Sequence, residues 1–570
     1  MSRSPLIHAF RRALRLALAA RRRGVPADEF APLARARRAA AIDRRGFIAR
    51  VGLSGIGLAA AAPLVGCGSS SGAAPVADTR VGVVGAGLAG LHAAWRLEAG
   101  GATVRVFDAG DRIGGRLLTL RDVFPDGLVA ELGAEFIEEE HRSMHALARA
   151  LDVTLDLLGA EGGAAAAPDV FHIGGRVLDE DAIARLMTPV AAAMARVAAD
   201  EDDDAAFDRH DRTSVAAWLD AQDFDPAARA LVELACVGDY GLDPDEQSLW
   251  NLIWLVDDFD AADPGDVIIE GERRYHAHTG SQTFTDRLAA ALTVDVELGT
   301  RLVRVARDAD GRVRLSFERG GAGFDEVFDE VVFALPFNQL RKVEFTFALP
   351  DDKRRVIDAL GMGTNAKLVF GATERVWRTR HGHAGTVTTD VGELQAVWDT
   401  GRGVQSARGV LTNFVGGRRG VALGAGEAEA RADEVRPWIE QVMPGFGAVY
   451  EAGSAIRMHW PSAPLFEGSY TCYRPGQAAL SGLEGTAAGN LHFCGEHASV
   501  DWQGLMEGAV ETSGAVAAVI LARAAHKSAR SYLRAWGMAS ALPLPAIDGR
   551  AARAMGRLGR RALRRAQRMG

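Results

Sequence analysis

The sequence has few of the residues that cross-link small proteins or bind metals in them. Four cysteines are spread over 570 residues, and neither their number nor their spacing predicts a disulfide framework or a zinc site. Cys472 and Cys494 are near enough in sequence to pair, but we favour burial as small apolar residues. Two His-x-His pairs, at 276–278 and 381–383, have no third ligand near them, so we expect no metal site.

Excess positive charge is also missing from most of the chain. The net charge is −9, but residues 1–66 contain 13 arginines and only three acids. The remainder has 52 basic and 71 acidic residues, a net charge of −19. Because a chain this acidic has little attraction for phosphate backbones, we predict no nucleic-acid partner. The length allows two or three domains with a large buried core.

Long hydrophobic runs are missing as well. The apolar segment at 51–66 has 16 residues, whereas a membrane-spanning helix needs about 20. It follows the pair Arg44 and Arg45, and this order resembles a twin-arginine export signal. We therefore predict that residues 1–67 are an export signal and that the mature protein is periplasmic or in the cell envelope.

The ends of the chain have two features that concern membranes. Cys67 closes a Leu-Val-Gly-Cys segment and precedes a Gly/Ser-rich stretch, which resembles a bacterial lipoprotein box. We favour lipidation of Cys67 over a chance cysteine, and expect it to anchor the protein to a membrane surface. Residues 526–570 form a basic tail, with eight arginines and no acid from Arg550 onward. An amphipathic helix on anionic lipid and a disordered tail explain this tail equally well.

A dinucleotide-binding pattern begins at the first apolar segment after the signal. Residues 80–84 predict a strand, and Gly-Ala-Gly-Leu-Ala-Gly at 85–90 predicts a tight turn into a helix that ends near Glu98. Residues 103–107 predict a second strand, which ends in Asp108. An acid 23 positions after the first glycine, in this context, is typical of a dinucleotide-binding βαβ unit.

Four residues of this unit have predicted roles in cofactor binding. Gly85 permits the tight turn, Gly87 lets the backbone approach the pyrophosphate, and Gly90 lets the helix pack close to the strand. The helix N-terminus offers free N–H groups and partial positive charge to the phosphates. Asp108 is expected to accept hydrogen bonds from the adenosine ribose.

Three further segments resemble the flavin-containing amine oxidases. Asp-Arg-Ile-Gly-Gly-Arg at 111–116 is similar to the D-R-x-G-G-R segment of that family, and Glu-Leu-Gly-Ala-Glu-Phe-Ile at 131–137 to its next flavin-facing segment. Residues 490–496, followed by a small-residue helix to about Ala524, resemble its C-terminal signature. The resemblance covers about residues 78–525 and implies FAD, rather than NAD, as the cofactor.

The resemblance also implies roles for residues along the whole mature chain. It adds to the cofactor-binding residues Gly115, Arg116, Gly133, Ala134, Val303, Gly495, Glu496, Leu505 and Met506. Val303 is expected to meet the adenine side through its backbone, and N–H groups at Leu505 and Met506 to face the flavin pyrimidine oxygens. Lys367 matches the family's active-site lysine, which holds a water near flavin N5. An exposed lysine at a strand end is the alternative.

The sequence departs from the family at three places that concern the substrate or the attachment of FAD. Tyr470 matches one wall of the aromatic cage of monoamine oxidases, but Leu505 stands where relatives usually have Tyr or Trp. Ser469 stands where oxidases with covalent FAD have a cysteine, so we predict non-covalent FAD. The segment 133–136 lacks the arginine with which L-amino acid oxidases bind the substrate carboxylate, which disfavours amino-acid substrates.

The resemblance implies an α/β fold in which a discontinuous Rossmann-like FAD-binding domain joins a mixed α+β substrate domain. The predicted ranges are 78–150, 271–340 and 471–525 for the first domain, and 151–270 and 341–470 for the second. We predict oxidation of an amine to an imine by hydride transfer to flavin N5, with O2 or another acceptor reoxidising the flavin. A desaturase or other oxidoreductase with a non-amine substrate and a non-catalytic flavin-binding envelope protein are the alternatives.

Overall fold

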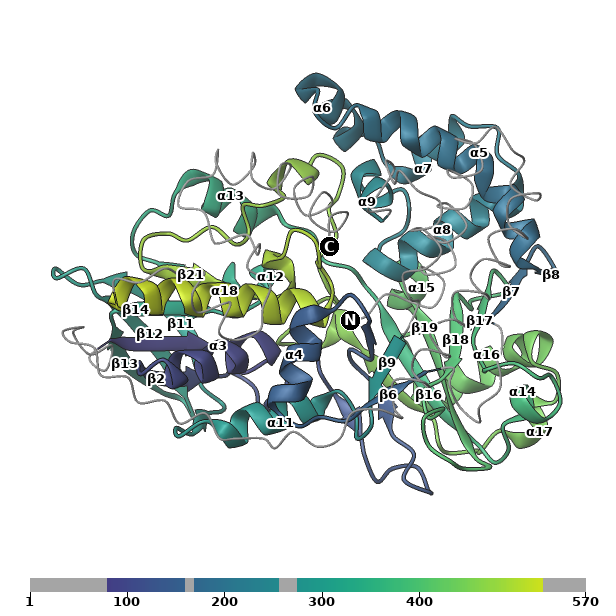
Figure 1. Cartoon of the computed structure of the whole chain (residues 1–570), viewed down its shortest axis with the longest axis horizontal. Helices are drawn as coiled ribbons and strands as arrows, with labels where there is room; N and C mark the ends of the chain where they lie inside the picture. The colour runs from purple at the N-terminus through teal and green to yellow at the C-terminus, as the bar shows by residue number, and fades with distance from the viewer. Residues whose placement is uncertain (1–78, 159–168, 256–273, 526–570) are drawn as a thin grey trace, which may run out of the picture.

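The computed structural model describes residues 79–158, 169–255 and 274–525, and its described part has two halves (Figure 1). The predicted export signal at 1–67 and the basic tail at 526–570 lie outside the described residues. The half at the left of Figure 1 contains both ends of the described chain, whereas the half at the right is built mostly from the middle.

A parallel five-stranded sheet forms the centre of the first half. Its strands, in spatial order, are β10 (Val296–Glu297), β2 (Thr103–Phe107), β1 (Arg80–Val84), β14 (Glu330–Phe333) and β21 (Leu491–Phe493). Every adjacent pair is parallel, and β1 and β14 are almost wholly buried apolar runs, as strands covered on both faces require. Three distant parts of the chain therefore complete one sheet.

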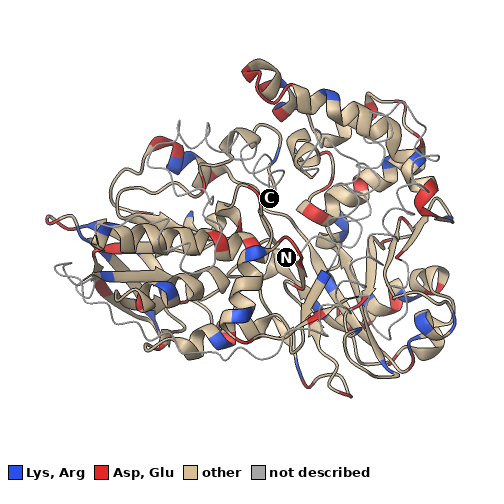
Figure 2. Ribbon diagram, in the orientation of Figure 1, with Lys and Arg blue, Asp and Glu red and all other residues tan. Residues whose placement is uncertain are grey.

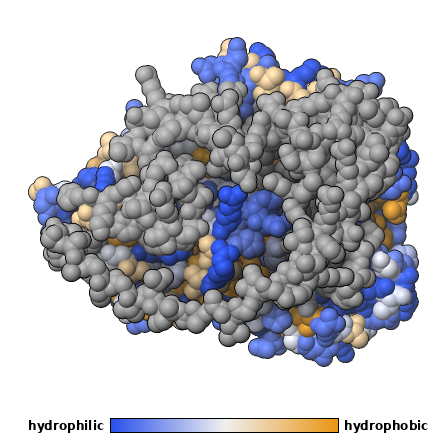
Figure 3. Space-filling view, viewed as in Figure 1, coloured by the Kyte–Doolittle hydropathy of each residue, from blue (hydrophilic) through white to orange (hydrophobic). Residues whose placement is uncertain are grey.

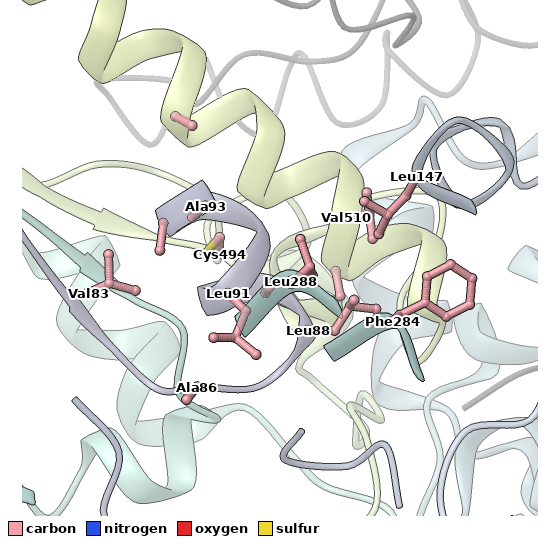
Figure 4. Close-up of a cluster of buried hydrophobic side chains, with 14 of the residues drawn as sticks. Val83, Ala86, Leu88, Leu91, Ala93, Leu147, Phe284, Leu288, Cys494 and Val510 are labelled. Carbon is pink, nitrogen blue, oxygen red and sulfur yellow. The ribbon is translucent and has the colours of Figure 1, made fainter. Parts of the chain in front are cut away.

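Helices cover one face of this sheet. α3 (Leu88–Ala99) lies alongside α18 (Met506–Ala525), with α4 (Arg142–Ala150) and α11 (Gln282–Ala291) next to them (Figure 1). Alanines and glycines on α3 and α18 let the two helices approach closely. Figure 4 shows the buried side chains that join these helices to the sheet, among them Val83, Leu91, Leu288 and Val510.

An antiparallel sheet covers the other face. It contains β11 (Arg301–Arg307), β12 (Val313–Arg319) and β13 (Ala322–Phe328), and β15 (Glu344–Phe345) pairs with β11 in parallel. Stacked rings join the two sheets, with the centroids of Phe107 and Phe317 4.2 Å apart. This arrangement of a parallel sheet between helices and an antiparallel sheet confirms the Rossmann-like α/β fold.

Two details define the edge of this half. The segment 296–307 forms two strands, β10 and β11, because Gly299 has a φ of +63° and turns the chain between the two sheets. β15 and α13 (Asp351–Ala359) also pack on this half. The FAD-binding half therefore continues to about residue 360, beyond the predicted boundary at 340.

A seven-stranded sheet organises the second half. Its order is β20 (Ile456–His459), β16 (Ala366–Ala372), β19 (Gly409–Val415), β18 (Ala396–Asp399), β17 (Val387–Thr389), β7 (Val170–Ile173) and β8 (Arg176–Leu178). All neighbours are antiparallel except β17 and β7. One face packs against α14 (Val376–Thr379), α16 (Ala428–Val442) and α17 (Phe446–Val449). The other face turns toward the first half.

A helical group and two small sheets complete the described chain. The group contains α5 (Glu180–Ala199), α6 (Asp204–Arg212), α7 (Val215–Asp220), α8 (Pro226–Tyr240) and α9 (Leu249–Trp254), at the upper right of Figure 1. The small sheets are β3 (Thr119–Leu120) with β4 (Ala130–Glu131), and β9 (Arg274–Ala277) between β5 (Phe136–Glu138) and β6 (Leu155–Leu157). The turn from β4 to β5 carries residues 132–135 to the junction of the two halves.

The described surface is mixed in charge. Basic and acidic residues are interspersed along the ribbons of both halves in Figure 2, and the part visible in Figure 3 is mostly hydrophilic. The large hydrophobic side chains exposed among the described residues are Val123, Val177 and Val421, which lie on three separate segments. α5 and α18 are long and apolar enough to cross a membrane, but both pack within the cores. Their composition is that of buried helices.

Candidate cofactor and active site

A cavity of about 370 Å³ lies at the carboxyl ends of β1, β2 and β14, the edge at which open parallel sheets bind ligands. Most of the residues predicted to bind the cofactor line it. They are Gly85, Gly87, Asp108, Gly115, Arg116, Ala134, Val303, Gly495, Glu496, Leu505 and Met506. Residues more than 400 positions apart therefore meet around one cavity.

The first glycine turn has the geometry that its motif predicts. Gly85 has a φ of +107°, and a Cβ there would lie 2.7 Å from the carbonyl oxygen of Ala334. Gly90 does not line the cavity, and a Cβ on it would overlap the carbonyl oxygen of Gly85, so its role is close packing of α3 against the turn. Gly87 begins α3 without a side-chain cap. The first N–H groups of α3 thus point into the cavity, where they suit a pyrophosphate.

Asp108 closes this turn and faces the cavity. One carboxylate oxygen accepts a hydrogen bond from Ala86 N at 2.6 Å, and the other from Gly110 N at 2.7 Å. Burial raises the pKa of Asp108, although these two donors and the nearby Arg112 oppose the change. A carboxylate oxygen has more than one lone pair, so both oxygens can still accept from ribose hydroxyls.

Val303 lines the cavity because β11 is irregular there. The pairing register between β11 and β12 shifts between Leu302 and Arg304, so Val303 lies at a β-bulge. A bulge leaves the backbone of its extra residue outside the ladder. The bulge therefore leaves the Val303 backbone out of the β11–β12 ladder at the cavity, where the family resemblance implies a contact with adenine.

An ion pair fastens the first flavin-facing segment to the last one. Arg116 Nη1 lies 2.7 Å from Glu496 Oε1, and also donates to the carbonyl oxygen of Ser469 at 2.8 Å. The second oxygen of Glu496 accepts from Gly504 N at 2.8 Å. Burial alone would raise the pKa of Glu496, but Arg116 more than offsets this effect and lowers it. The pair therefore links the first and last flavin-facing segments of the described chain across the cavity.

The amino end of α18 lies at the cavity beside Leu505 and Met506. Leu505 N donates to the carbonyl oxygen of Trp502 at 3.2 Å, so the free N–H groups begin with the first turn of α18 at Met506. Their partial positive charge faces the cavity and suits the negative charge of a reduced flavin ring. The glycine cradle, the two helix N-termini and Asp108 fit the phosphates, ribose and ring of FAD.

The cysteines are poorly placed for covalent attachment of the cofactor. Ser469, where some relatives have a cysteine, is buried and donates a hydrogen bond to Asn365 Oδ1 at 2.7 Å. Cys472 is 1% exposed, and burial raises its pKa. Cys236, Cys472 and Cys494 are all free and buried, so Cys472 and Cys494 do not pair.

The two His-x-His pairs are not part of a metal-binding cluster within the described chain. Among residues 79–158, 169–255 and 274–525, no group of three or more His, Cys, Asp or Glu side chains is arranged to hold a metal ion. His276 lies 3.3 Å from Glu131 Oε1, and His278 lies 2.8 Å from Asp156 Oδ2. Each histidine of this pair thus has a carboxylate partner within the fold.

Lys367 lies at the junction of the two halves and is fully enclosed. It is 2% exposed, and its ammonium group donates to the carbonyl oxygens of Glu131 at 2.8 Å and Gly133 at 3.0 Å. Its third contact is Glu135 Oε2 at 2.9 Å. The alternative of an exposed lysine at a strand end is therefore wrong.

Gly133 has a structural position behind the cavity wall. It does not line the cavity, and a Cβ on it would overlap the carbonyl oxygen of Arg116. The next residue, Ala134, does line it. Gly133 thus lets the segment pack flat against the 111–116 segment while its own carbonyl oxygen binds Lys367. Its direct contact with cofactor, implied by the resemblance, is replaced by this packing role.

Aromatic side chains form a wall next to Lys367. The ring centroids of Phe136 and Trp398 are 5.7 Å apart, and those of Trp398 and Phe414 5.5 Å. Lys367 Nζ lies 5.2 Å from the Trp398 ring. Tyr470 packs on Gly504 beside Leu505, and its hydroxyl donates to the carbonyl oxygen of Gly238 at 2.8 Å. The surroundings of Lys367 on this side are therefore mainly aromatic.

The sequence analysis missed several residues that the structure brings to these sites. The cavity is also lined by Pro336, His497 and residues 463–466, and the aromatic wall by Trp398 and Phe414. His497 follows the Gly-Glu signature directly, so it had a local signal. Trp398 and Phe414 had none, because only the pairing of β18 with β19 brings them together.

Comparison with known proteins agrees with this arrangement. The family model described as flavin-containing amine oxidoreductase matches residues 88–521. (S)-6-hydroxynicotine oxidase from Paenarthrobacter nicotinovorans is 25% identical over 453 residues, which are 77% of this chain and 98% of that protein. L-amino acid dehydrogenase from Synechocystis is 23% identical over 471 residues, 77% of this chain and 94% of that protein.

Solved structures with the same fold include two amine oxidases. Putrescine oxidase bound to putrescine superposes with a TM-score of 0.67 at 22% identity, and covers 78% of this chain and 99% of its own. Cyclohexylamine oxidase from Brevibacterium oxydans has a TM-score of 0.66 at 23% identity, with the same coverage. With the match of the family model over most of its length, the chain belongs to the flavin-containing amine oxidoreductases, FAD-dependent enzymes that oxidise amines.

Proposed function

We propose that this enzyme oxidises a predominantly apolar amine that has no carboxylate next to the reacting carbon. The observation that carries the proposal is the junction of the two halves, where Phe136, Trp398 and Phe414 form an aromatic cluster in contact with Lys367 and the buried Glu135 carboxylate. A substrate carboxylate there would be desolvated next to another carboxylate, which is costly. An apolar amine loses little on entering such a site.

When bound in the cavity, FAD would supply the hydride acceptor that converts the amine to an imine. The protein binds and orients the two reactants, and needs no nucleophile of its own. Tyr470 and Leu505 enclose the amine from two sides, and the hydrogen bond from Tyr470 to Gly238 fixes the position of the ring. Buried apolar side chains exclude water, and the N-terminus of α18 stabilises negative charge at the pyrimidine edge.

Non-covalent attachment of FAD is part of the same proposal. Ser469 replaces the cysteine of covalent relatives, and the buried Cys472 is held at 3.4 Å from Asn251 Nδ2. Unfolding in trichloroacetic acid should therefore release all flavin into the supernatant. Flavin that stayed with the precipitated protein would contradict non-covalent binding.

The proposed substrate class is tested by reduction of the enzyme-bound flavin without oxygen. Purified holoenzyme is mixed anaerobically with aliphatic amines, arylalkylamines, diamines and L-amino acids, and flavin absorbance is followed. We expect rapid bleaching by apolar monoamines and at least about tenfold slower bleaching by their α-carboxylated counterparts. Bleaching by amino acids alone would refute the proposed substrate class, and bleaching only by non-amine compounds would favour a desaturase.

We also propose that the protein reaches the cell envelope by the twin-arginine route and is lipidated at Cys67. The sequence order of Arg44-Arg45, a weakly apolar run and Cys67 supports this. Export should fail when Arg44 and Arg45 are both replaced by Lys. Cys67→Ser should leave export intact but release the enzyme from the membrane fraction. If the Ser variant remained membrane-bound, Cys67 would not be the anchor.

A further inference from the structure

The ammonium group of Lys367 has no hydrogen left for a water molecule. Its three donors are directed at the carbonyl oxygens of Glu131 and Gly133 and at Glu135 Oε2, all within 3.0 Å. An ammonium group has three donors and no acceptor. A water that bound Lys367 would have to displace one of these protein acceptors.

The Glu135 carboxylate is equally well held. Besides Lys367, it accepts hydrogen bonds from Trp398 Nε1 and Thr400 Oγ1, each at 2.8 Å, and it is 3% exposed. Burial alone would raise the pKa of Glu135, but Lys367 and then His276 more than offset this effect, so that the pKa is lowered. Glu135 is therefore a fixed negative charge in contact with Lys367.

This ion pair lies directly behind the wall of the FAD cavity. The carbonyl oxygen of Gly133 binds Lys367, the side chain of Glu135 binds it too, and Ala134 between them lines the cavity. Two other charged groups bear on Glu135: His276, which pairs with Glu131, and Arg402. Lys367 is the cation in contact with this carboxylate and with the wall.

We infer that Glu135 neutralises Lys367 beside the flavin, and thereby slows the transfer of electrons from reduced flavin to dioxygen. Reoxidation by O2 takes two electrons from the reduced flavin and, with two protons, yields oxidised flavin and hydrogen peroxide. Negative charge develops on dioxygen as it receives the first electron, and a nearby cation stabilises it. An anion in contact with that cation cancels most of this field.

Glu135 is thus assigned as a positioning residue for electron transfer. The inference rests on the FAD of the proposed function, but it does not depend on the identity of the amine. The flavin can be reduced with light and EDTA under anaerobic conditions and then mixed with oxygenated buffer. Failure of any amine to reduce the enzyme would refute the proposed function and leave this measurement unaffected.

Glu135→Gln is the decisive variant because it keeps the shape of the side chain and removes its charge. We expect the second-order rate constant for reoxidation by O2 to rise about tenfold or more, which corresponds to an activation barrier lowered by roughly 1.4 kcal/mol. The rate with dichlorophenolindophenol as acceptor should change less than about twofold. Glu135→Asp, which restores the charge, should return the O2 rate toward that of the wild type.

Removal of the lysine separates this explanation from general loosening of the site. Lys367→Met combined with Glu135→Gln should reoxidise as slowly as the wild type, because no cation remains to stabilise charge on dioxygen. Glu484→Gln is a matched control, since Glu484 is also a buried acid but bonds to Tyr473, away from Lys367. An unchanged O2 rate in Glu135→Gln, or an increase that persisted without Lys367, would overturn the inference.

A second measurement uses protein without flavin. If the two side chains form a compensating pair, Lys367→Met alone should lower the Tm of the apoprotein more than the double variant does, since it leaves an unpaired buried carboxylate. Additive shifts in Tm would show that the charges are not coupled, and would contradict the assignment of Glu135 even if the oxygen rates changed.

Discussion

The cofactor cavity and the substrate wall are built by different means. The cavity is made mostly by backbone: glycine turns, the bulge at Val303 and the N-termini of α3 and α18. The substrate wall is made by side chains, such as Phe136, Trp398 and Phe414, on strands of two different sheets. Backbone recognition suits a ligand shared by a whole family, whereas side chains can change with the substrate.

This contrast predicts that substitutions at the two sites impair different properties of the enzyme. A substitution at the cavity should alter backbone geometry, with loss of FAD and of stability together. A substitution at the wall should alter the rates with particular amines and leave the flavin bound. The following tests, ordered from the largest expected effect to the smallest, examine that distinction.

Gly90→Ala should have the largest effect. The added Cβ would overlap the carbonyl oxygen of Gly85, so α3 must move away from β1 at a cost of about 3 kcal/mol or more. Apoprotein Tm and FAD affinity, measured by flavin fluorescence, should both fall. Gly323→Ala is the control, because its Cβ would meet the nearest atom at 3.7 Å. Full FAD binding in Gly90→Ala would show that close packing of α3 is unnecessary.

Arg116→Leu should have the next largest effect. It leaves the Glu496 carboxylate buried without its cation, a change that costs about 3–5 kcal/mol. Chemical denaturation should show this loss, and FAD should dissociate faster because the first and last segments are no longer tied. Arg354→Leu, which removes an exposed pair with Asp358, should change stability little. Equal effects of the two variants would argue against the bridging role of Arg116.

His497→Phe tests whether His497, which lines the cavity, makes the stability of the protein depend on pH. Burial lowers the pKa of His497 to about 4, below the ordinary value of about 6.5. The unfolded chain therefore binds a proton that the folded chain does not, so stability falls as pH drops from about 6.5 to 4, by at most about 1.4 kcal/mol per pH unit. The variant should lose this part of the pH dependence in apoprotein unfolding. Parallel curves for both proteins would contradict the assignment.

Leu505→Tyr should have the smallest and most selective effect. It adds an aromatic ring opposite Tyr470, and such ring contacts contribute about 0.5–1.5 kcal/mol. We expect flavin reduction by arylalkylamines to become severalfold more efficient, with no loss of FAD. Leu505→Met serves as the control of similar size. Weaker FAD binding in the Tyr variant alone would place position 505 with the cofactor rather than with the substrate.

The same contrast explains what could be predicted from the sequence. The strand at 103–107 and the glycine turn were predicted correctly, because their signals are local and backbone-based. The hydrogen bond between Lys367 and Glu135 was not predicted, although both residues lie in segments with a family resemblance. The two residues are 232 positions apart, and their contact depends on how the two halves pack. Position along a strand reveals which face a side chain occupies, but not its partner across a domain junction.

The order of strands in the parallel sheet has a consequence for biogenesis. β1 and α3 emerge from the ribosome early, whereas β21 and α18, which complete the same sheet and helix layer, emerge some 400 residues later. Long-range pairing of this kind folds slowly. The nascent enzyme can therefore retain FAD only after β21 and α18 have been synthesised. A yellow colour then reports a polypeptide that extends to α18, and one that ends before β21 remains colourless.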